Sequence, residues 1–213
     1  MKLYYKPGAC SMAVHIALNE VGASFDLEKV DTRTQRTETG ADFARINPNG
    51  YVPVLAMDDG EIFTEAPAIL QLIADRHPGA TLAPASGTVE RIRLQEQLNF
   101  TASELHKSFS PLFAADAPAG KNREAVVAKV LRRMESIERS LSDGRSYLLG
   151  DDFTVADAYT YVVCTWTGPT GIGLDRWPHV KAYVARVSAR PAVRAALRRE
   201  GLLADSAPQR ATA

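Results

Sequence analysis

The hydrophobic pattern of this chain changes near residue 77, and no other feature constrains the fold as strongly. Residues 1–77 alternate short apolar runs of strand length with amphipathic segments of helix length. From Thr88 onward, apolar residues recur only at intervals of three and four, the period of a helix that buries one face. We therefore predict an α/β domain at residues 1–77, a linker at 78–87, an all-helical domain at 88–203 and a loose tail at 204–213.

The α/β domain has the predicted element order β-α-β followed by β-β-α. Strands at 3–5 and 25–30 flank a helix at 11–21, and a hairpin at 52–64 leads into a helix at 65–76. Asp59-Gly60 forms the hairpin turn, because this pair tolerates the left-handed backbone conformation that such turns require.

The second domain shows helical periodicity throughout. Thr154 and Asp157 stand three residues apart before an apolar run, which predicts a capping box at a helix start. Pro191 indicates a break or restart within the last helical stretch. The long helices are expected at 90–113, 123–142 and 179–199.

Composition and charge limit the binding partners and the cellular compartment that we expect for this protein. The 213 residues include 25 basic and 25 acidic side chains, so no basic excess favours nucleic acid or an anionic membrane. The first apolar run is too short for a secretion signal, and no run approaches the roughly 18 residues that span a bilayer. Two cysteines do not make a disulfide framework. We expect a cytoplasmic protein that binds neither nucleic acid nor membrane.

Cys10 is the residue that points most directly to chemistry. It follows a strand and a Pro7-Gly8 turn and stands at the start of a helix, where unpaired N–H groups and the helix dipole favour a thiolate. Ala13 occupies the place of the second cysteine in a C-x-x-C redox motif, so redox work needs an outside thiol such as glutathione. The alternative is a small buried hydrophobe, which is our interpretation of Cys164.

Five segments stand in this order along the chain: Lys2 to Ser11, Asn47 to Pro53, Thr64 to Ile69, Glu104 to Phe113 and Phe153 to Tyr159. Together they make the chain resemble the glutathione transferase family, and most closely its bacterial beta class. The resemblance covers residues 1 to about 203 and implies a thioredoxin-like first domain, glutathione as co-substrate, an electrophilic small molecule as second substrate, and a homodimer. We expect no metal, because no His or Cys pair stands at metal-ligand spacing.

The resemblance also implies a set of site residues. Cys10 and His106 would be catalytic. Val52 before a cis Pro53 would pair its backbone with the peptide-like glutathione, and the start of the 65–76 helix would hold the γ-glutamyl carboxylate. The implied glutathione-binding residues are Gln35, Val52, Glu65, Ala66, Asn99, Ser103, Glu104 and Lys107. On periodicity alone, the stripe formed by Asn99, Ser103 and His106 is more typical of a solvated helix face.

Two positions depart from the family pattern. Ala66 stands where the family often has serine, which removes a hydroxyl contact to the γ-glutamyl carboxylate. Gln35 stands where beta-class proteins often carry lysine, so it would meet the glycyl carboxylate without a charge. Arg33 or Arg36 would supply the positive charge toward the glycyl carboxylate that Gln35 lacks. Both departures bear on the affinity for glutathione and not on the fold.

The sequence therefore supports three functions. The first is a glutathione transferase with thiol-disulfide and peroxidase capability through Cys10. The second is a dedicated glutathione-dependent reductase or dehalogenase. The third is a non-catalytic interaction protein on the same fold. Phe109, Phe113 and Trp166 are either walls of an apolar pocket or core residues, and His15, His77 and His179 show no metal-ligand spacing.

Overall fold

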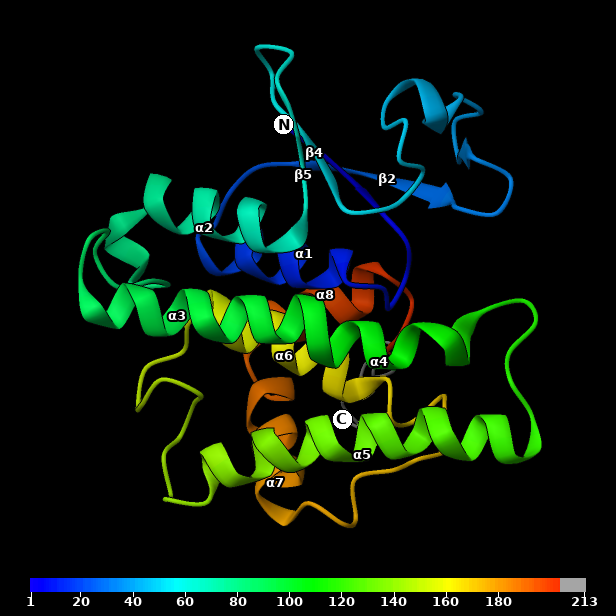
Figure 1. The fold of residues 1–213 in the computed structure, drawn as a ribbon. Helices are drawn as coiled ribbons and strands as arrows, with labels where there is room; N and C mark the ends of the chain where they lie inside the picture. The colour runs from blue at the N-terminus through cyan, green and yellow to red at the C-terminus, as the bar shows by residue number, and fades with distance from the viewer. Residues whose placement is uncertain (204–213) are drawn as a thin grey trace, which may run out of the picture.

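The computed structural model describes residues 1–203, in which a five-stranded sheet lies above two helices and a larger group of helices (Figure 1). The chain therefore has the predicted fold class, a thioredoxin-like α/β domain followed by an all-helical domain. The tail predicted at 204–213 lies outside the described residues.

The sheet has the strand order β3-β2-β1-β4-β5. β1 pairs in parallel with β2, and antiparallel pairing joins β2 to β3, β1 to β4 and β4 to β5. The two residues of β3 were not predicted, because a run this short carries no periodic signal. The strands are β1 (Lys2–Tyr5), β2 (Asp26–Asp31), β3 (Arg36–Thr37), β4 (Val54–Ala56) and β5 (Ile62–Thr64).

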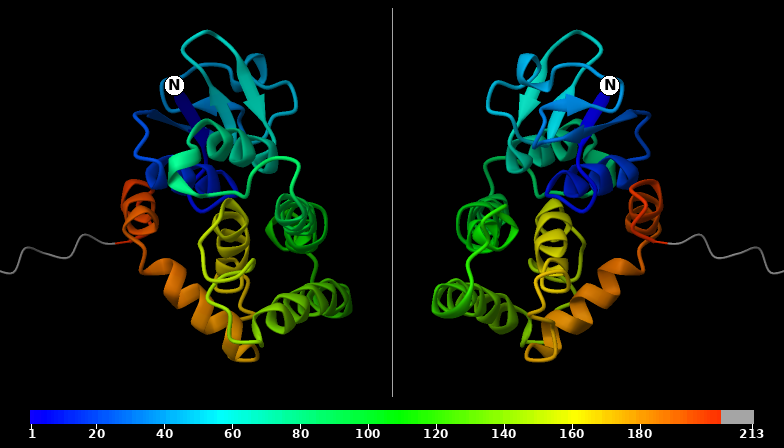
Figure 2. Two further views of the ribbon diagram at one scale, coloured as in Figure 1. Left: turned by 90° about the vertical axis from the view of Figure 1, so that its left-hand side faces the viewer. Right: turned by 90° about the vertical axis from the view of Figure 1, so that its right-hand side faces the viewer.

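Two helices separate the sheet from the helical domain, as the side views show (Figure 2). They are α1 (Ser11–Glu20) and α2 (Ala66–Arg76). All residues of α1 from Ser11 to Leu18 are buried, because α1 packs against β1 and α2 of its own domain and against α6 and α8 of the other. This double burial explains why α1 is buried on all sides rather than along one stripe. A smaller core covers the other side of the sheet, where Phe43 packs on Val30, Val52 and Val54.

The helical domain departs from the prediction in its first helix. Instead of one α-helix over 90–113, the chain forms α3, a π-helical segment η3, the short helix α4 and a 3₁₀ turn η4. Two further 3₁₀ turns, η1 (Phe43–Arg45) and η2 (Pro78–Ala80), lie in the connections. The remaining bounds are α3 (Val89–Phe100), η3 (Thr101–His106), α4 (Lys107–Phe109), η4 (Ser110–Phe113), α5 (Gly120–Leu141), α6 (Val155–Thr165), α7 (Pro178–Ser188) and α8 (Pro191–Arg199).

Helix α6 is the central element of this domain and begins at the predicted capping box. The Asp157 carboxylate accepts hydrogen bonds from the Thr154 N–H at 2.9 Å and from the Leu148 N–H at 2.9 Å. Every residue from Val155 to Cys164 is buried. The capping box is therefore confirmed, as are the restart at Pro191 and the packing role of Cys164. No helix within residues 1–203 is both long and apolar enough to cross a membrane.

Candidate functional site

The loop between β1 and α1 places Cys10 at the N-terminal cap of α1. Ser11 closes this loop from within, because its hydroxyl oxygen accepts the Lys6 N–H at 3.1 Å and its O–H faces the Lys6 carbonyl at 3.2 Å. Gly8 has φ +70°, a conformation that favours glycine at this turn. The Cys10 thiol donates to the Val52 carbonyl at 3.4 Å and is thereby directed toward the segment before β4.

The helical domain fixes the same loop from the outside. The Glu200 carboxylate accepts the Gly8 N–H at 2.9 Å and lies 2.9 Å from His15 Nδ1, while the Trp166 indole N–H donates to the Gly8 carbonyl at 2.8 Å. Both side chains of the His15–Glu200 pair are fully buried. The sequence analysis missed this arrangement, because residues 185 positions apart leave no local signal.

Burial decides the protonation state of Cys10. The backbone N–H groups of Cys10 and Ser11 lower the pKa of the thiol, as expected at a helix start, but burial outweighs them and raises the pKa from 9.0 to about 11. The helix start therefore lowers the pKa of the thiol, as the sequence analysis expected, but burial has the larger effect, so Cys10 carries its proton at neutral pH.

Val52, in the segment before β4, and Glu65, at the N-terminal cap of α2, lie next to the Cys10 loop. The Val52-Pro53 peptide bond is cis, as the resemblance implied. Glu65 caps α2 with φ +67° and ψ 111°, a conformation that is costly for any residue other than glycine and is typical of functional sites. Its exposed carboxylate accepts the Tyr51 hydroxyl at 2.8 Å. Pro67 has no N–H, so Ala66 carries the first backbone donor of α2.

His106 joins this group from the end of the π-helical segment. Its Nδ1 lies 2.8 Å from the Tyr159 hydroxyl, and its ring meets the Trp166 ring edge to face at 4.7 Å. Burial, and next the charge of Lys107, lower the pKa of His106 from 6.5 to about 4, so the imidazole is neutral at pH 7. Burial raises the pKa of Tyr159, and the nearby Cys10 and Glu65 raise it further. Tyr159 is thus a site residue to which the sequence analysis gave no role.

Three of the sequence-predicted residues are exposed and form no hydrogen bond or ion pair with the Cys10 loop within residues 1–203. Asn99 and Ser103 are exposed on the outer face of α3 and η3, where the Ser103 hydroxyl donates to the Asn99 carbonyl at 2.8 Å. Glu104 forms an ion pair with Arg133 of α5. Lys107, by contrast, is close enough to Cys10 for its charge to lower the pKa of the thiol.

Gln35 holds its own loop in the α/β domain. Its amide nitrogen donates to the Thr32 carbonyl at 2.6 Å and to the Gly50 carbonyl at 2.9 Å. Its amide oxygen is buried and has no partner within residues 1–203. In this arrangement both amide hydrogens are engaged, so the side chain must rotate before it donates to a carboxylate. Arg33 and Arg36 are exposed on the same loop.

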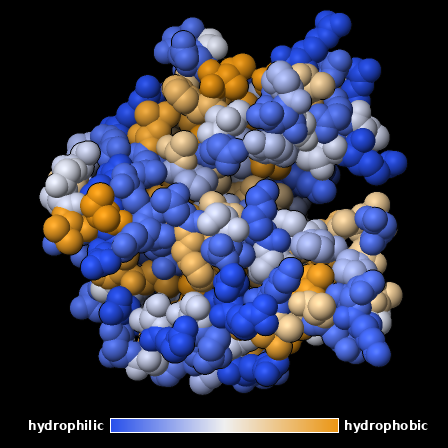
Figure 3. All heavy atoms as spheres, viewed as in Figure 1, coloured by the Kyte–Doolittle hydropathy of each residue, from blue (hydrophilic) through white to orange (hydrophobic). Residues whose placement is uncertain are grey.

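The aromatic residues divide between core and surface. Phe109 is fully buried and belongs to the core, whereas Phe113 is 51% exposed. Both rings meet Trp166 edge to face, at 5.9 Å and 5.5 Å between centroids. An indentation on the right of the space-filling view separates the α/β domain from the helical domain on this side (Figure 3). Residues 1–203 contain no group of three or more His, Cys, Asp or Glu side chains that would hold a metal ion.

Two family models match the chain. The model of the glutathione S-transferase N-terminal domain matches residues 8–76, and that of the glutathione S-transferase C-terminal domain matches residues 100–191. Among curated proteins, glutathione S-transferase GstA of Escherichia coli O157:H7 is 41% identical over 202 residues, which cover 95% of this chain and all of the relative.

Solved structures of glutathione transferases are similar to this chain at higher sequence identity. A ternary complex of BphK, a bacterial glutathione transferase, is 49% identical with a TM-score of 0.91. The bacterial beta-class enzyme of Sphingomonas chungbukensis is 46% identical with a TM-score of 0.90. A sphingomonad glutathione S-transferase complexed with glutathione is 45% identical with a TM-score of 0.89. Each comparison covers 95% of this chain and all of the other.

Proposed function

This chain belongs to the glutathione S-transferase family and is a glutathione transferase of the beta-class type, and we propose that its Cys10 acts mainly as a hydrogen-bond donor to the glutathione thiolate. The observation that carries the proposal is the protonated, directed Cys10 thiol beside a neutral His106. A protonated thiol is a weak nucleophile but is able to donate its hydrogen.

In conjugation, glutathione would lie along Val52 with its sulfur near Cys10. The glutathione thiol loses its proton to water, and the thiolate then attacks an electrophilic carbon, from which a halide or another leaving group departs. The N–H groups at the start of α1 and the Cys10 S–H stabilise the thiolate. Glu65 and the Ala66 N–H would hold the γ-glutamyl end, the carboxylate of Glu65 meeting the ammonium.

His106 would supply a second neutral donor. The raised pKa of Tyr159 keeps its hydroxyl protonated, so we infer that this hydroxyl donates to Nδ1 of the neutral imidazole. The ring proton then sits on Nε2, which is free to donate to a sulfur. Lys107 adds positive potential near the thiolate.

A thiol-disulfide activity would use Cys10 directly. The Cys10 thiolate attacks the glutathione sulfur of a mixed disulfide, forms a Cys10–glutathione disulfide and releases the other thiol. A second glutathione thiolate then attacks that disulfide, which gives oxidised glutathione and restores Cys10. In reduction of a peroxide, the Cys10 thiolate would attack the O–O bond, release an alcohol and become a sulfenic acid. One glutathione would convert the sulfenic acid to the Cys10–glutathione disulfide with loss of water, and a second glutathione would restore Cys10 and leave as oxidised glutathione. Because the pKa of Cys10 is about 11, this activity should be slow at neutral pH and rise with pH.

Replacing Cys10 by alanine separates the two activities. Cys10→Ala should abolish reduction of a glutathione mixed disulfide, since no sulfur remains to form the intermediate. Conjugation of an aryl halide should fall only about tenfold, the equivalent of one good hydrogen bond. The measurement is kcat/KM for both substrates with the same preparations, with Cys164→Ala as the matched control. Equal losses in both activities would show that Cys10 is the nucleophile or essential activator throughout.

The pH dependence of alkylation tests the protonation state itself. In a Cys164→Ala background without glutathione, the rate of Cys10 alkylation by iodoacetamide should rise about tenfold per pH unit from pH 7 to 9. The urea-unfolded protein should instead level off near pH 9, the ordinary value for a thiol. A plateau below pH 7 in the folded protein would show that the helix start wins over burial.

We further propose that the protein is a cytoplasmic homodimer. Asn99 and Ser103 are exposed on α3 and η3 rather than beside Cys10, which suits a role toward the glutathione site of a second subunit. Sedimentation at micromolar concentration should give twice the 23.1 kDa chain mass, and a monomer at all concentrations would reject the dimer. A non-catalytic interaction role predicts retention on immobilised glutathione without turnover.

A further inference from the structure

Tyr51 stands immediately before the Val52-Pro53 cis bond and is not used by the proposed transferase mechanism. Tyr51 is 43% exposed, although Val52 and Pro53, which follow it, are buried. Packing in the core therefore does not explain where this side chain lies. The contact that places it is polar, because its hydroxyl donates to Oε1 of Glu65 at 2.8 Å.

A buried asparagine fixes the backbone at Tyr51. The Asn47 side chain donates from Nδ2 to the Tyr51 carbonyl at 2.8 Å, and the Asn47 carbonyl accepts the Gly50 N–H at 2.9 Å. Asn47 is itself buried, and Gly50 has φ +72°, a conformation that favours glycine at this turn. The Tyr51 side chain is therefore held at both ends, by Asn47 at its backbone and by Glu65 at its hydroxyl.

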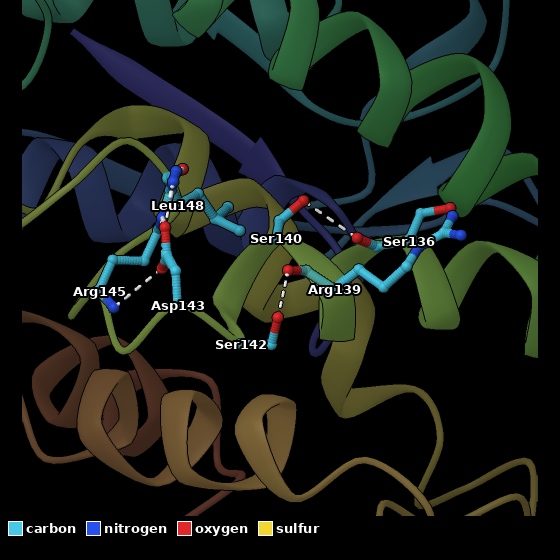
Figure 4. A network of polar contacts seen from close by, with 7 residues as sticks. All are labelled: Ser136, Arg139, Ser140, Ser142, Asp143, Arg145 and Leu148. Carbon is cyan, nitrogen blue, oxygen red and sulfur yellow. Dashed lines mark hydrogen bonds and ion pairs between the residues drawn. The ribbon is translucent and has the colours of Figure 1, made fainter.

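The Tyr51 hydroxyl differs from the serine hydroxyls of the helices. At the end of α5, the Ser140 hydroxyl donates to the Ser136 carbonyl at 3.0 Å and the Ser142 hydroxyl donates to the Arg139 carbonyl at 2.8 Å (Figure 4). Those hydroxyls satisfy carbonyl groups of their own helix. The Tyr51 hydroxyl instead gives its single hydrogen to the charged side chain that caps α2, so only its oxygen lone pairs remain for a third group.

The carboxylate that accepts this hydrogen has no cation of its own among the described residues. None of the ion pairs within residues 1–203 involves Glu65. The bond from Tyr51 uses Oε1, which leaves Oε2 for a ligand. Glu65 also lies close enough to Cys10 for its charge to add to the burial that raises the pKa of the thiol. Glu65 and Tyr51 thus form a negative, acceptor-only site beside the Cys10 loop.

We propose that the Tyr51 hydroxyl is a second acceptor for the γ-glutamyl ammonium of glutathione and makes the site selective for thiols that carry this ammonium. The proposal rests on the proposed function, which brings that ammonium to Glu65. An ammonium group has three donors and no acceptor, so it complements a carboxylate and a hydroxyl oxygen that lie 2.8 Å apart. The phenol hydrogen does not oppose the ammonium, because it already points to Oε1.

Titration calorimetry tests the proposal with S-hexylglutathione and with its desamino form, in which a glutaryl group replaces the γ-glutamyl group. In Tyr51→Phe, the Kd of S-hexylglutathione should rise about fivefold, as for the loss of one hydrogen bond. The Kd of the desamino ligand should be the same in Tyr51→Phe and the unmodified protein. The kcat for an aryl halide at saturating glutathione should also be unchanged. Tyr4→Phe on β1, where the ring packs against Phe43, is the matched control and should alter neither Kd.

The variants Glu65→Gln and Tyr51→Phe/Glu65→Gln separate this proposal from the proposed function. Glu65→Gln should weaken S-hexylglutathione, and adding Tyr51→Phe should then raise the Kd by less than twofold, because both side chains act on one ammonium. The proposal is overturned if Tyr51→Phe behaves like Tyr4→Phe, if it weakens both ligands equally, or if the two substitutions are additive. If Glu65→Gln itself has no effect, the placement of the γ-glutamyl end in the proposed function fails as well.

Discussion

The two ends of the candidate glutathione site are held in place in different ways. The Cys10 loop is fixed from both domains, by the buried Glu200 and by Trp166. Within residues 1–203, Gln35 holds its loop by hydrogen bonds to Thr32 and Gly50 of the same α/β domain. The end that performs chemistry therefore depends on the whole molecule, whereas the end that would receive the glycyl carboxylate depends on its own neighbours.

This difference predicts which substitutions in the site lower the stability of the protein and which do not. A buried hydrogen-bonded pair that loses one partner leaves the other group buried without compensation. A half-buried side chain such as Gln35 loses less when another donor such as lysine replaces it, because the new donor or water can take over its contacts with the backbone carbonyls. We therefore expect substitutions at the Cys10 end to affect stability and catalysis together, and substitutions at the Gln35 end to affect affinity alone.

Removing Glu200 should have the largest effect. Glu200→Ala leaves the Gly8 N–H and His15 without their buried partner and should lower the free energy of unfolding by about 3–5 kcal/mol. It should also raise KM for glutathione, because the Cys10 loop loses its anchor. Urea unfolding measures the free energy of unfolding, and steady-state kinetics measure KM for glutathione. Glu200→Gln keeps an acceptor for the Gly8 N–H and should lower the free energy of unfolding by less. Glu124→Ala, on the exposed start of α5, is the control. Equal stability of Glu200→Ala and the control would refute the anchor.

Acid should destabilise the protein through His106. Its pKa is 6.5 when unfolded and about 4 when folded, so between these values the unfolded chain binds a proton that the folded protein does not. The free energy of unfolding therefore falls as pH drops from 6.5 to 4, by at most about 3 kcal/mol from this residue. His106→Gln should show a shallower fall over this range than the unmodified protein, while the exposed His179→Gln should not. Parallel curves for all three proteins would argue against a buried neutral His106.

Changing Gln35 should have the smallest effect and leave stability nearly unchanged. Gln35→Lys adds a charge for the glycyl carboxylate and should tighten glutathione binding about fivefold, roughly 1 kcal/mol. Thr34→Lys adds the same charge at the exposed neighbouring position and controls for a general electrostatic gain. Equal tightening by both variants would place the carboxylate elsewhere, and a large loss of stability in Gln35→Lys would contradict the local character of this loop.

The sequence predicted the architecture well, because periodicity and turn chemistry are local properties. The change of pattern near residue 77, the capping box at Thr154 and Asp157, and the restart at Pro191 all have counterparts in the structure. The π-helical segment at Thr101–His106 was missed, because the widened turn keeps Leu105 buried and leaves the apolar spacing close to that of an α-helix. The two-residue β3 was too short to leave a pattern.

The candidate site was harder to predict, because its properties depend on burial and on distant contacts. The position of Cys10 at a helix start was visible in the sequence, but the burial that raises its pKa was not. The partnership of His106 with Tyr159 joins residues 53 positions apart, and that of Gly8 with Glu200 joins residues 192 apart. Rules based on local sequence patterns do not predict contacts between residues so far apart in the chain.

The Glu200 anchor also sets an order of events during synthesis. Translation adds the 192 residues that separate Gly8 from Glu200 in about 10–40 seconds, at roughly 5–20 residues per second. During that interval the strands around Cys10 can pair, but α1 still lacks α6 and α8, its partners in the helical domain. The nascent chain therefore carries an unfinished reactive centre, and competence for chemistry arrives late, together with the segment that contains α8.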